Sequence, residues 1–197
     1  MIAQRTPSIV VIAGPNGAGK STIAPHLLRS VLRIPHFVNA DVIAKGLSFL
    51  HPETVSFTAG RIMLRRMEEL AVSRADFAFE TTLASRTLAP WLTRQLRRGF
   101  DLRMVYLWLP DPSLAIARVS SRVQMGGHHV PEDTIRRRYE AGIRNFFRLF
   151  MPLTAAWAFY DNSGQDGIRE LAWGSGREEQ AVADPAMWNQ LKSRFAA

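Results

Sequence analysis

Residues 14–21, GPNGAGKS, constrain the fold more than any other part of the chain. They match the pattern G-x-x-x-x-G-K-[ST], in which glycines let backbone amides approach a phosphate closely. The apolar residues 9–13 come directly before this loop, and a helical pattern begins at Lys20. A strand that passes through such a loop into a helix predicts an α/β domain that binds a nucleotide.

The residue types of this loop predict separate roles. The loop amides and the start of the helix direct partial positive charge at phosphate oxygens. Lys20 is expected to reach the β- and γ-phosphates, and the Ser21 hydroxyl is expected to bind Mg²⁺. We take ATP as the nucleotide, although the loop alone does not distinguish ATP from GTP. The nucleotide-binding residues predicted here are Gly14, Pro15, Asn16, Gly17, Ala18, Gly19, Lys20, Ser21 and Thr22.

Apolar segments alternate with amphipathic patterns along the rest of the chain. Strands are predicted at residues 9–13, 36–39, 77–80, 102–109 and 156–160, and helices at residues 20–32, 52–73, 88–98, 112–125 and 131–150. This alternation favours an α/β, three-layer P-loop NTPase fold, with a mostly parallel sheet of about five to six strands flanked by helices. We expect one domain over residues 1–197, with a lid at about 118–138. Residues 165–197 are expected to form a C-terminal extension of a hairpin and a short helix from Pro185.

The composition excludes several classes of site. The chain has no cysteine, which excludes disulfides and thiolate chemistry. It has no apolar run of the ~20 residues that cross a bilayer and no signal-peptide pattern, so we expect a cytoplasmic protein without a membrane partner. The net charge is +8, but the arginine run at residues 136–138 has no interleaved aromatic residues. Nucleic acid is therefore not the favoured partner.

The sequence lacks the marks of two other phosphate-loop classes. A transporter ATPase would carry a signature near LSGGQ and a later Asp-Glu pair, and a switch GTPase would carry N-K-x-D; none of these is present. A small-molecule kinase remains, which needs a base for the acceptor, an acceptor pocket and arginines on a closing lid.

Polar residues end two of the predicted strands, at the edge where ligands bind in open parallel sheets. Asp41, in HFVNADVIA, suits a base for an acceptor hydroxyl, a residue that helps to hold Mg²⁺, or a helix N-cap. Glu80 and Thr82, in FAFETTLAS, suit contact with a polar acceptor such as a sugar, with helix capping as the alternative. Glu80 also follows an apolar strand, as a Walker B metal carboxylate does, so its role stays open.

Arg118 and Arg122 are four residues apart and therefore share a helix face. Arginine on a mobile lid can neutralise charge on the transferred phosphoryl group, and solvated surface charge is the alternative. The pair precedes Gly126 and Gly127, which favour a flexible joint, and the histidines at 128 and 129. Adjacent histidines without a further ligand indicate a metal only weakly, so we expect contact with phosphate or substrate from one of them.

In their order along the chain, the phosphate loop, NAD, ETT and the arginine-bearing helix with a basic lid resemble the zeta toxin family of P-loop kinases. The resemblance covers roughly residues 9–164. It implies ATP-dependent phosphorylation of UDP-N-acetylglucosamine at its 3′-hydroxyl, and it leaves room for an antitoxin partner. By resemblance, Asp41 takes the position of the general base and Arg118 that of a lid arginine. Glu80 and Thr82 take the sugar-contact positions.

The sequence departs from the family pattern at one position. A second lid arginine is expected a few residues before Pro131, where His128 stands instead, and we assign His128 to the substrate. YDNSG at residues 160–164 resembles the adenine-side loop, which assigns Asn162 to the nucleotide. Arg122 is also counted among the nucleotide-binding residues.

The leading hypothesis is an ATP- and Mg²⁺-dependent phosphotransferase for a small hydroxylated acceptor, with UDP-N-acetylglucosamine as the first candidate. Lys20 and Arg118 would stabilise the transferred phosphoryl group, and Asp41 would activate the acceptor hydroxyl. The alternatives are a nucleotide-dependent binding or regulatory ATPase and an RNA 5′-hydroxyl kinase.

Overall fold

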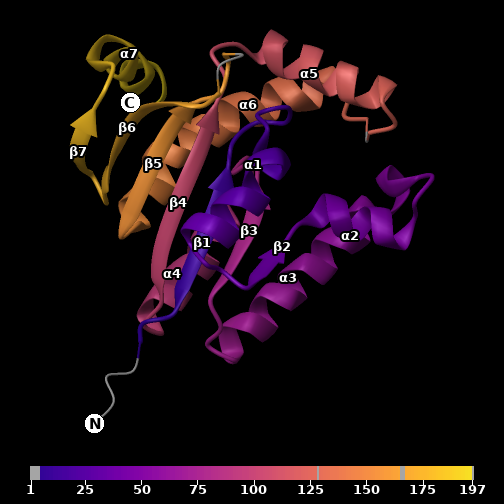
Figure 1. The fold of residues 1–197 in the computed structure, drawn as a ribbon, viewed down its shortest axis with the longest axis horizontal. Coiled ribbons are helices and arrows are strands. Elements are labelled where there is room, and N and C mark those ends of the chain that lie inside the picture. Colours follow the sequence, from indigo (N-terminus) through magenta and orange to yellow (C-terminus); the bar gives the residue numbers. More distant parts are fainter. Residues whose placement is uncertain (1–4, 128, 165–166, 197) are drawn as a thin grey trace.

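A computed structural model describes residues 5–127, 129–164 and 167–196. It contains a seven-stranded sheet in the order β2-β3-β1-β4-β5-β6-β7 (Figure 1). Strands β2, β3, β1, β4 and β5 pair in parallel, whereas β6 and β7 continue the sheet antiparallel. The strands are β1 Ser8–Ala13, β2 His36–Val38, β3 Phe77–Thr81, β4 Asp101–Trp108, β5 Ala156–Asp161, β6 Arg169–Ser175 and β7 Glu178–Val182. This confirms the α/β class, with more strands than the five to six expected, because the C-terminal hairpin joins the sheet.

Helices cover both faces of the sheet and make it the middle of three layers (Figure 1). On β1, Val10 and Ile12 pack in a small cluster with Ala24 and Leu28, on the face that α1 covers. Ile9 and Val11 point the other way, into the main core. The helices are α1 Lys20–His26, α2 Ala40–Leu47, α3 Ser56–Val72, α4 Leu88–Arg97, α5 Pro112–Gln124, α6 Glu132–Asn145 and α7 Pro185–Phe195. Shorter turns are η1 Leu27–Val31, η2 Pro52–Val55, η3 Phe146–Phe150 and η4 Met151–Leu153.

Two helices differ from the sequence prediction for local reasons. The helix expected at residues 20–32 contains Pro25, which has no N–H to donate, and α1 gives way to the π-helical turn η1. Helix α2 was not predicted as a separate element. Its N-cap is Asn39, whose side chain accepts hydrogen bonds from the backbone N–H groups of Asp41 and Val42. The alternative role of Asp41 as the N-cap is therefore wrong, and its carboxylate is not used for capping.

Helix α6 is held against the carboxyl edge of the sheet. The Tyr139 hydroxyl donates to the Leu109 carbonyl at 2.7 Å and accepts from Trp108 Nε1 at 3.2 Å. One turn on, Gly142 lies so close to the Thr82 carbonyl that a Cβ would collide with it. Asn145 Nδ2 donates to the Leu83 carbonyl at 2.8 Å. These contacts fix the helix that runs past the ends of β3 and β4.

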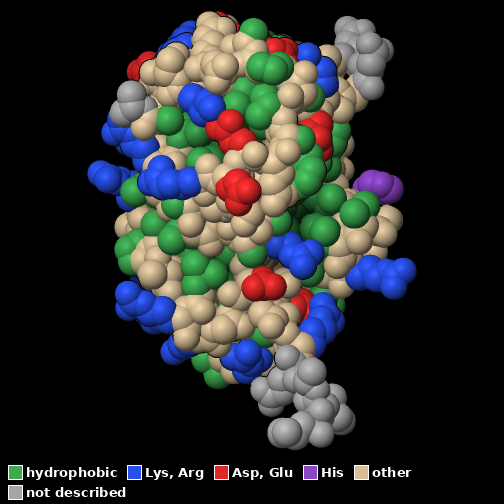
Figure 2. Space-filling view, turned by 90° about the vertical axis from the view of Figure 1, so that its left-hand side faces the viewer, with side chains coloured by type: hydrophobic (Ala, Val, Ile, Leu, Met, Phe, Trp, Pro, Cys, Tyr) green, Lys and Arg blue, Asp and Glu red, His purple; other side chains and the backbone are tan. Residues whose placement is uncertain are grey.

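The C-terminal hairpin and helix confirm the elements expected there. Helix α7 packs on the sheet through Trp188, which stacks on Trp157 of β5 with a centroid distance of 5.5 Å. Figure 2 shows the side of the molecule that carries β7 and α7, where acidic side chains lie among the basic ones. Among the described residues, no helix is long and apolar enough to span a membrane.

We expect Tyr139→Phe to lower the free energy of unfolding by about 1–3 kcal/mol, because it leaves the Leu109 carbonyl and the Trp108 N–H without their partner. Burial raises the pKa of Tyr139 to about 12. Stabilisation by a group whose pKa is raised on folding is complete below the unfolded value and lost as pH rises through the folded one. In urea unfolding, the difference in free energy of unfolding between wild type and Tyr139→Phe should therefore decrease as the pH rises from about 10 to 12. Tyr160→Phe changes a half-buried tyrosine and is the matched control. It should lower the free energy of unfolding less than Tyr139→Phe does.

Candidate functional site

The phosphate loop joins β1 to α1 in an open conformation that its glycines permit. Gly14, Gly17 and Gly19 have φ of 140°, 76° and 80°, which favour glycine. At Gly14 a Cβ would also collide with the Leu107 carbonyl of β4. The backbone therefore sits tightly on the ends of β1 and β4, with the first turn of α1 following it.

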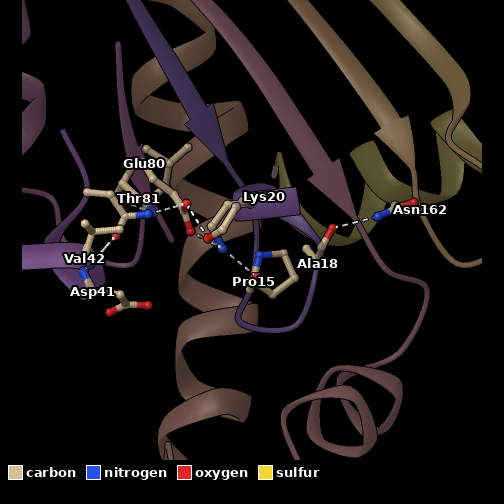
Figure 3. A network of polar contacts seen from close by, with 11 residues as sticks. Pro15, Ala18, Lys20, Asp41, Val42, Glu80, Thr81 and Asn162 are labelled. Carbon is tan, nitrogen blue, oxygen red and sulfur yellow. Dashed lines mark hydrogen bonds and ion pairs between the residues drawn. The ribbon is translucent and has the colours of Figure 1, made fainter. Parts of the chain in front are cut away.

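Lys20 is buried beneath this loop. Its Nζ donates to the Pro15 carbonyl at 2.8 Å and lies 3.7 Å from Glu80 Oε1 (Figure 3). Burial lowers the pKa of the Lys20 ammonium, and the carboxylates of Glu80 and Asp41 oppose that shift. A buried cation costs free energy unless an anion compensates it, so the site favours a bound phosphate.

Glu80, at the end of β3, connects three segments. It accepts hydrogen bonds from Ser21 Oγ at 2.8 Å and from Asn39 Nδ2 at 2.7 Å, in addition to its contact with Lys20. The sequence left two binding roles open for Glu80, contact with a sugar and support of a metal ion. Its hydrogen bond from Ser21 favours the second role. A hydroxyl and a carboxylate next to a phosphate-binding loop are oxygen ligands that suit Mg²⁺. No group of three or more His, Asp or Glu side chains that could hold a metal occurs in the described part of the chain.

Asp41 lies in the first turn of α2, exposed beside the phosphate loop. Its carboxylate accepts no hydrogen bond from any described residue, and Figure 3 shows it at the edge of the polar network without a dashed contact. It lines a pocket of about 300 Å³ between α2 and the end of α5. The pocket is lined by Ser21, Asn39, Asp41, Val42, Lys45, Arg122, Met125, Gly126 and Gly127. The Asp41 carboxylate is thus open to solvent in a pocket that it shares with Ser21.

The two arginines of α5 line different pockets. Arg122 lines the pocket of Asp41 and Ser21. Arg118 instead donates to the carbonyls of Asn162 at 2.7 Å and Ser163 at 3.2 Å, and it lines a second pocket of about 540 Å³ with Gly17, Gly19, Thr22, Ile23 and Asn162. Asn162 Nδ2 donates to the Ala18 carbonyl at 2.9 Å, so the segment after β5 is fastened to the phosphate loop.

The remaining predicted residues are placed less directly. Thr82 is half-buried at the end of β3, and its carbonyl lies against Gly142 of α6. His128 lies outside the described residues.

Arg138 is not among the site residues predicted from the sequence, because the arginine run at 136–138 was considered there only as a possible contact for nucleic acid. Arg138 is half-buried one turn before Gly142. Burial is the main effect that lowers its pKa, and Arg137 adds to it, whereas the Asp41 carboxylate opposes it. Arg138 therefore interacts electrostatically with Asp41. One feature of the sequence pointed to Arg138: it lies four residues before Gly142, on the face of α6 that meets the end of β3.

Solved structures show the same fold at low sequence identity. A chain of the crystal structure of AvrRxo1-ORF1:-ORF2 with ATP superposes with a TM-score of 0.71 at 16% identity, over 95% of this chain and 64% of that one. A structure of the PezAT chromosomal toxin-antitoxin system of Streptococcus pneumoniae superposes with a TM-score of 0.67 at 14% identity, over 98% and 79%. The chain thus spans less than two thirds of the AvrRxo1 chain.

Sequence comparisons reach the family level. An uncharacterized protein of Haemophilus influenzae is 25% identical over 130 residues, which are 66% of this chain and 91% of that protein. The model of the zeta toxin family matches residues 1–151, which reach from the N-terminus to the start of η4, just beyond α6 and η3. The chain therefore belongs to the zeta toxin family.

Proposed function

We propose that the protein is an ATP-dependent kinase that phosphorylates a hydroxyl group of a small acceptor. The observation that carries the proposal is the single pocket shared by Ser21 of the phosphate loop, Arg122 of α5 and the open carboxylate of Asp41. Donor phosphate and acceptor hydroxyl would meet there. The parallel sheet supports this, since ligands bind at the carboxyl ends of its strands.

The residues divide into a donor side and an acceptor side. The loop amides and Lys20 would hold the β- and γ-phosphates, and Ser21, supported by Glu80, would hold Mg²⁺, which neutralises phosphate charge. Asp41 would take the proton of the acceptor hydroxyl as its oxygen bonds to the γ-phosphorus and the bond to the leaving ADP breaks. We assign the developing charge to Arg122 rather than to Arg118, because Arg122 lines this pocket. Arg118 would shape the nucleotide side through Asn162.

UDP-N-acetylglucosamine is the first candidate acceptor, on the strength of family membership and the position of Asp41. Thr82 remains a candidate sugar contact, and His128 remains a prediction from the sequence. The matched structures of toxin–antitoxin proteins support an antitoxin partner for this chain as well. We propose that the protein acts in the cytoplasm, where ATP and this acceptor would be available to it.

Lys20→Ala should reduce turnover by about 10²–10³-fold, because it removes the cation that faces the transferred phosphate. The variant should remain folded, because the Glu80 carboxylate keeps its hydrogen bonds from Ser21 and Asn39. Transfer of labelled γ-phosphate measures the first effect and thermal unfolding the second. A folded variant with unchanged turnover would contradict the role of the loop.

Asp41→Asn should lower kcat by about 10²–10⁴-fold and leave nucleotide affinity unchanged, because the amide cannot accept the proton. Asp133→Asn, at an exposed position in the first turn of α6, is the control and should keep wild-type turnover. The assay follows phosphate transfer to a panel of UDP-sugars, simple sugars and 5′-hydroxyl oligonucleotides. If wild type phosphorylates none of them and no member speeds ATP loss, the kinase proposal fails. Transfer to the oligonucleotide alone would identify an RNA 5′-hydroxyl kinase.

Arg122→Ala and Arg118→Ala should separate in steady-state kinetics. Loss of Arg122 should lower kcat by about tenfold or more, because it removes charge from the transfer pocket. Loss of Arg118 should mainly raise KM for ATP, because the segment that contacts Ala18 loses two anchoring hydrogen bonds. The reverse pattern would return the phosphoryl role to Arg118.

A further inference from the structure

The turn between α2 and α3 exposes large apolar side chains to solvent. Phe49 and Leu50 follow α2, and Phe57 lies in the first turn of α3; their exposed fractions are 83%, 80% and 80%. We call these three residues the apolar tip. In Figure 1 the turn that carries them lies at the right-hand end of the view, away from the sheet. Because apolar surface of this size is costly to leave in water, the tip indicates a surface that meets an apolar partner.

The apolar tip projects from the molecule and does not line the cavities beside it. One pocket lies along α2 and a smaller one beside Pro52, and neither is lined by Phe49, Leu50 or Phe57. Small-molecule sites are concave, so the tip does not suit a small ligand. A broad and deformable surface could take up protruding phenylalanine and leucine side chains, as the boundary between lipid headgroups and acyl chains does.

Basic side chains continue the surface of the apolar tip along α3. Arg61 and Leu64 lie four and seven residues after Phe57, on the same outward face of the helix, and both are exposed. Arg61 forms no hydrogen bond or ion pair with any described residue. Arg65 is also exposed and has Glu69 as its partner at 3.3 Å. Positive charge therefore lies directly beside the exposed apolar side chains.

The charge balance around the apolar tip distinguishes between possible partners. Residues 45–66 contain a single acidic residue, Glu53, and the basic residues Lys45, Arg61, Arg65 and Arg66. Lysine and arginine side chains are attracted to a surface of anionic lipids. In a two-fold dimer formed through the tip, the same cations of both copies would be brought together, because both copies contribute the same patch. Charge complementarity therefore favours an anionic lipid surface over a second copy of this chain.

We propose that the apolar tip inserts into the interface of a membrane that contains anionic lipids, while Arg61 and Arg65 bind the phosphate groups at its surface. This binding needs no helix that spans the bilayer, so the expectation of no membrane partner, which rested on the lack of such a segment, does not bear on it. Helix α2 joins the tip to the pocket of Asp41, and its eight residues span about 12 Å. A bound protein would thus hold that pocket near the lipid surface.

Co-sedimentation of the full chain with lipid vesicles tests the proposal. One set of vesicles contains phosphatidylcholine alone, and the other contains phosphatidylcholine and phosphatidylglycerol in equal parts. Wild type should bind the anionic vesicles about tenfold more tightly than the neutral ones, and added salt should weaken this binding. Joint substitution of Phe49→Ser and Phe57→Ser should lower the affinity about tenfold or more, because the apolar area that enters the interface is lost.

Matched variants control for changes elsewhere on the surface. Val72→Ser removes a side chain that is 70% exposed at the opposite end of α3, and it should bind vesicles as wild type does. Arg61→Gln should lower the affinity for anionic vesicles about fivefold, whereas Arg29→Gln, at an exposed position of η1, should leave it unchanged. Since all of these side chains are exposed, thermal unfolding of each variant should stay close to that of wild type.

Insertion can be distinguished from adsorption by charge alone, because the chain has no cysteine. Leu50→Cys and Val72→Cys each provide a single thiol for a polarity-sensitive fluorophore. With anionic vesicles, the emission of the label at residue 50 should shift to the blue, because the label enters an apolar environment. The emission of the label at residue 72 should not change.

The proposal would be overturned by the absence of binding to anionic vesicles at low salt, by binding that survives the joint substitution at the tip, or by an unchanged emission of the label at residue 50. A dimer that the joint substitution dissociates, without any binding to vesicles, would assign the tip to a second copy of this chain. Phosphate transfer in solution should be the same for wild type and the tip variants. Lipid binding and kinase activity can therefore fail independently of each other.

Discussion

The Glu80 carboxylate holds the site together. It joins Lys20 and Ser21, at the end of the phosphate loop, to Asn39 after β2, so that three segments far apart in the sequence meet at the end of β3. Parallel pairing of β1, β2 and β3 brings their carboxyl ends to one edge of the sheet and makes this meeting possible. Charge-assisted hydrogen bonds to a half-buried carboxylate are among the stronger polar contacts in proteins. The donor loop is thereby tied to the segment that starts α2.

The position of α2, which carries Asp41, depends on the hydrogen bond between Asn39 and Glu80. With one end of its side chain Asn39 donates to Glu80, and with the other it caps α2. A capped α2 presents Asp41 and Lys45 on one face beside the loop. The same carboxylate that supports Ser21 therefore also sets where the acceptor would bind. In the proposed function, one polar network around Glu80 and Asn39 would therefore position both the donor and the acceptor.

A second set of contacts shapes the nucleotide side. Arg118 and Asn162 fasten the segment after β5 to α5 and to the phosphate loop. In an arginine-rich chain the position of each guanidinium decides its role, because charge alone does not distinguish them. Arg118 is held by carbonyl oxygens, whereas Arg122 lines the pocket of Asp41 and Ser21, and Arg138 interacts electrostatically with Asp41. The positions of Arg118 and Arg122 on α5, and of Arg138 on α6, therefore determine which part of the site each arginine contacts.

The sequence by itself determined the phosphate loop, the α/β class and the position of Asp41 and Glu80 at the carboxyl edge of the sheet, because these depend on local pattern and on the rule that ligands bind at strand carboxyl ends. It also identified the family. Only the tertiary structure decided that Asn39 rather than Asp41 caps α2, that Glu80 supports Ser21, and that Arg122 and Arg138 rather than Arg118 lie near Asp41. Those choices depend on contacts between residues up to about a hundred positions apart, which helix periodicity and capping preferences do not encode.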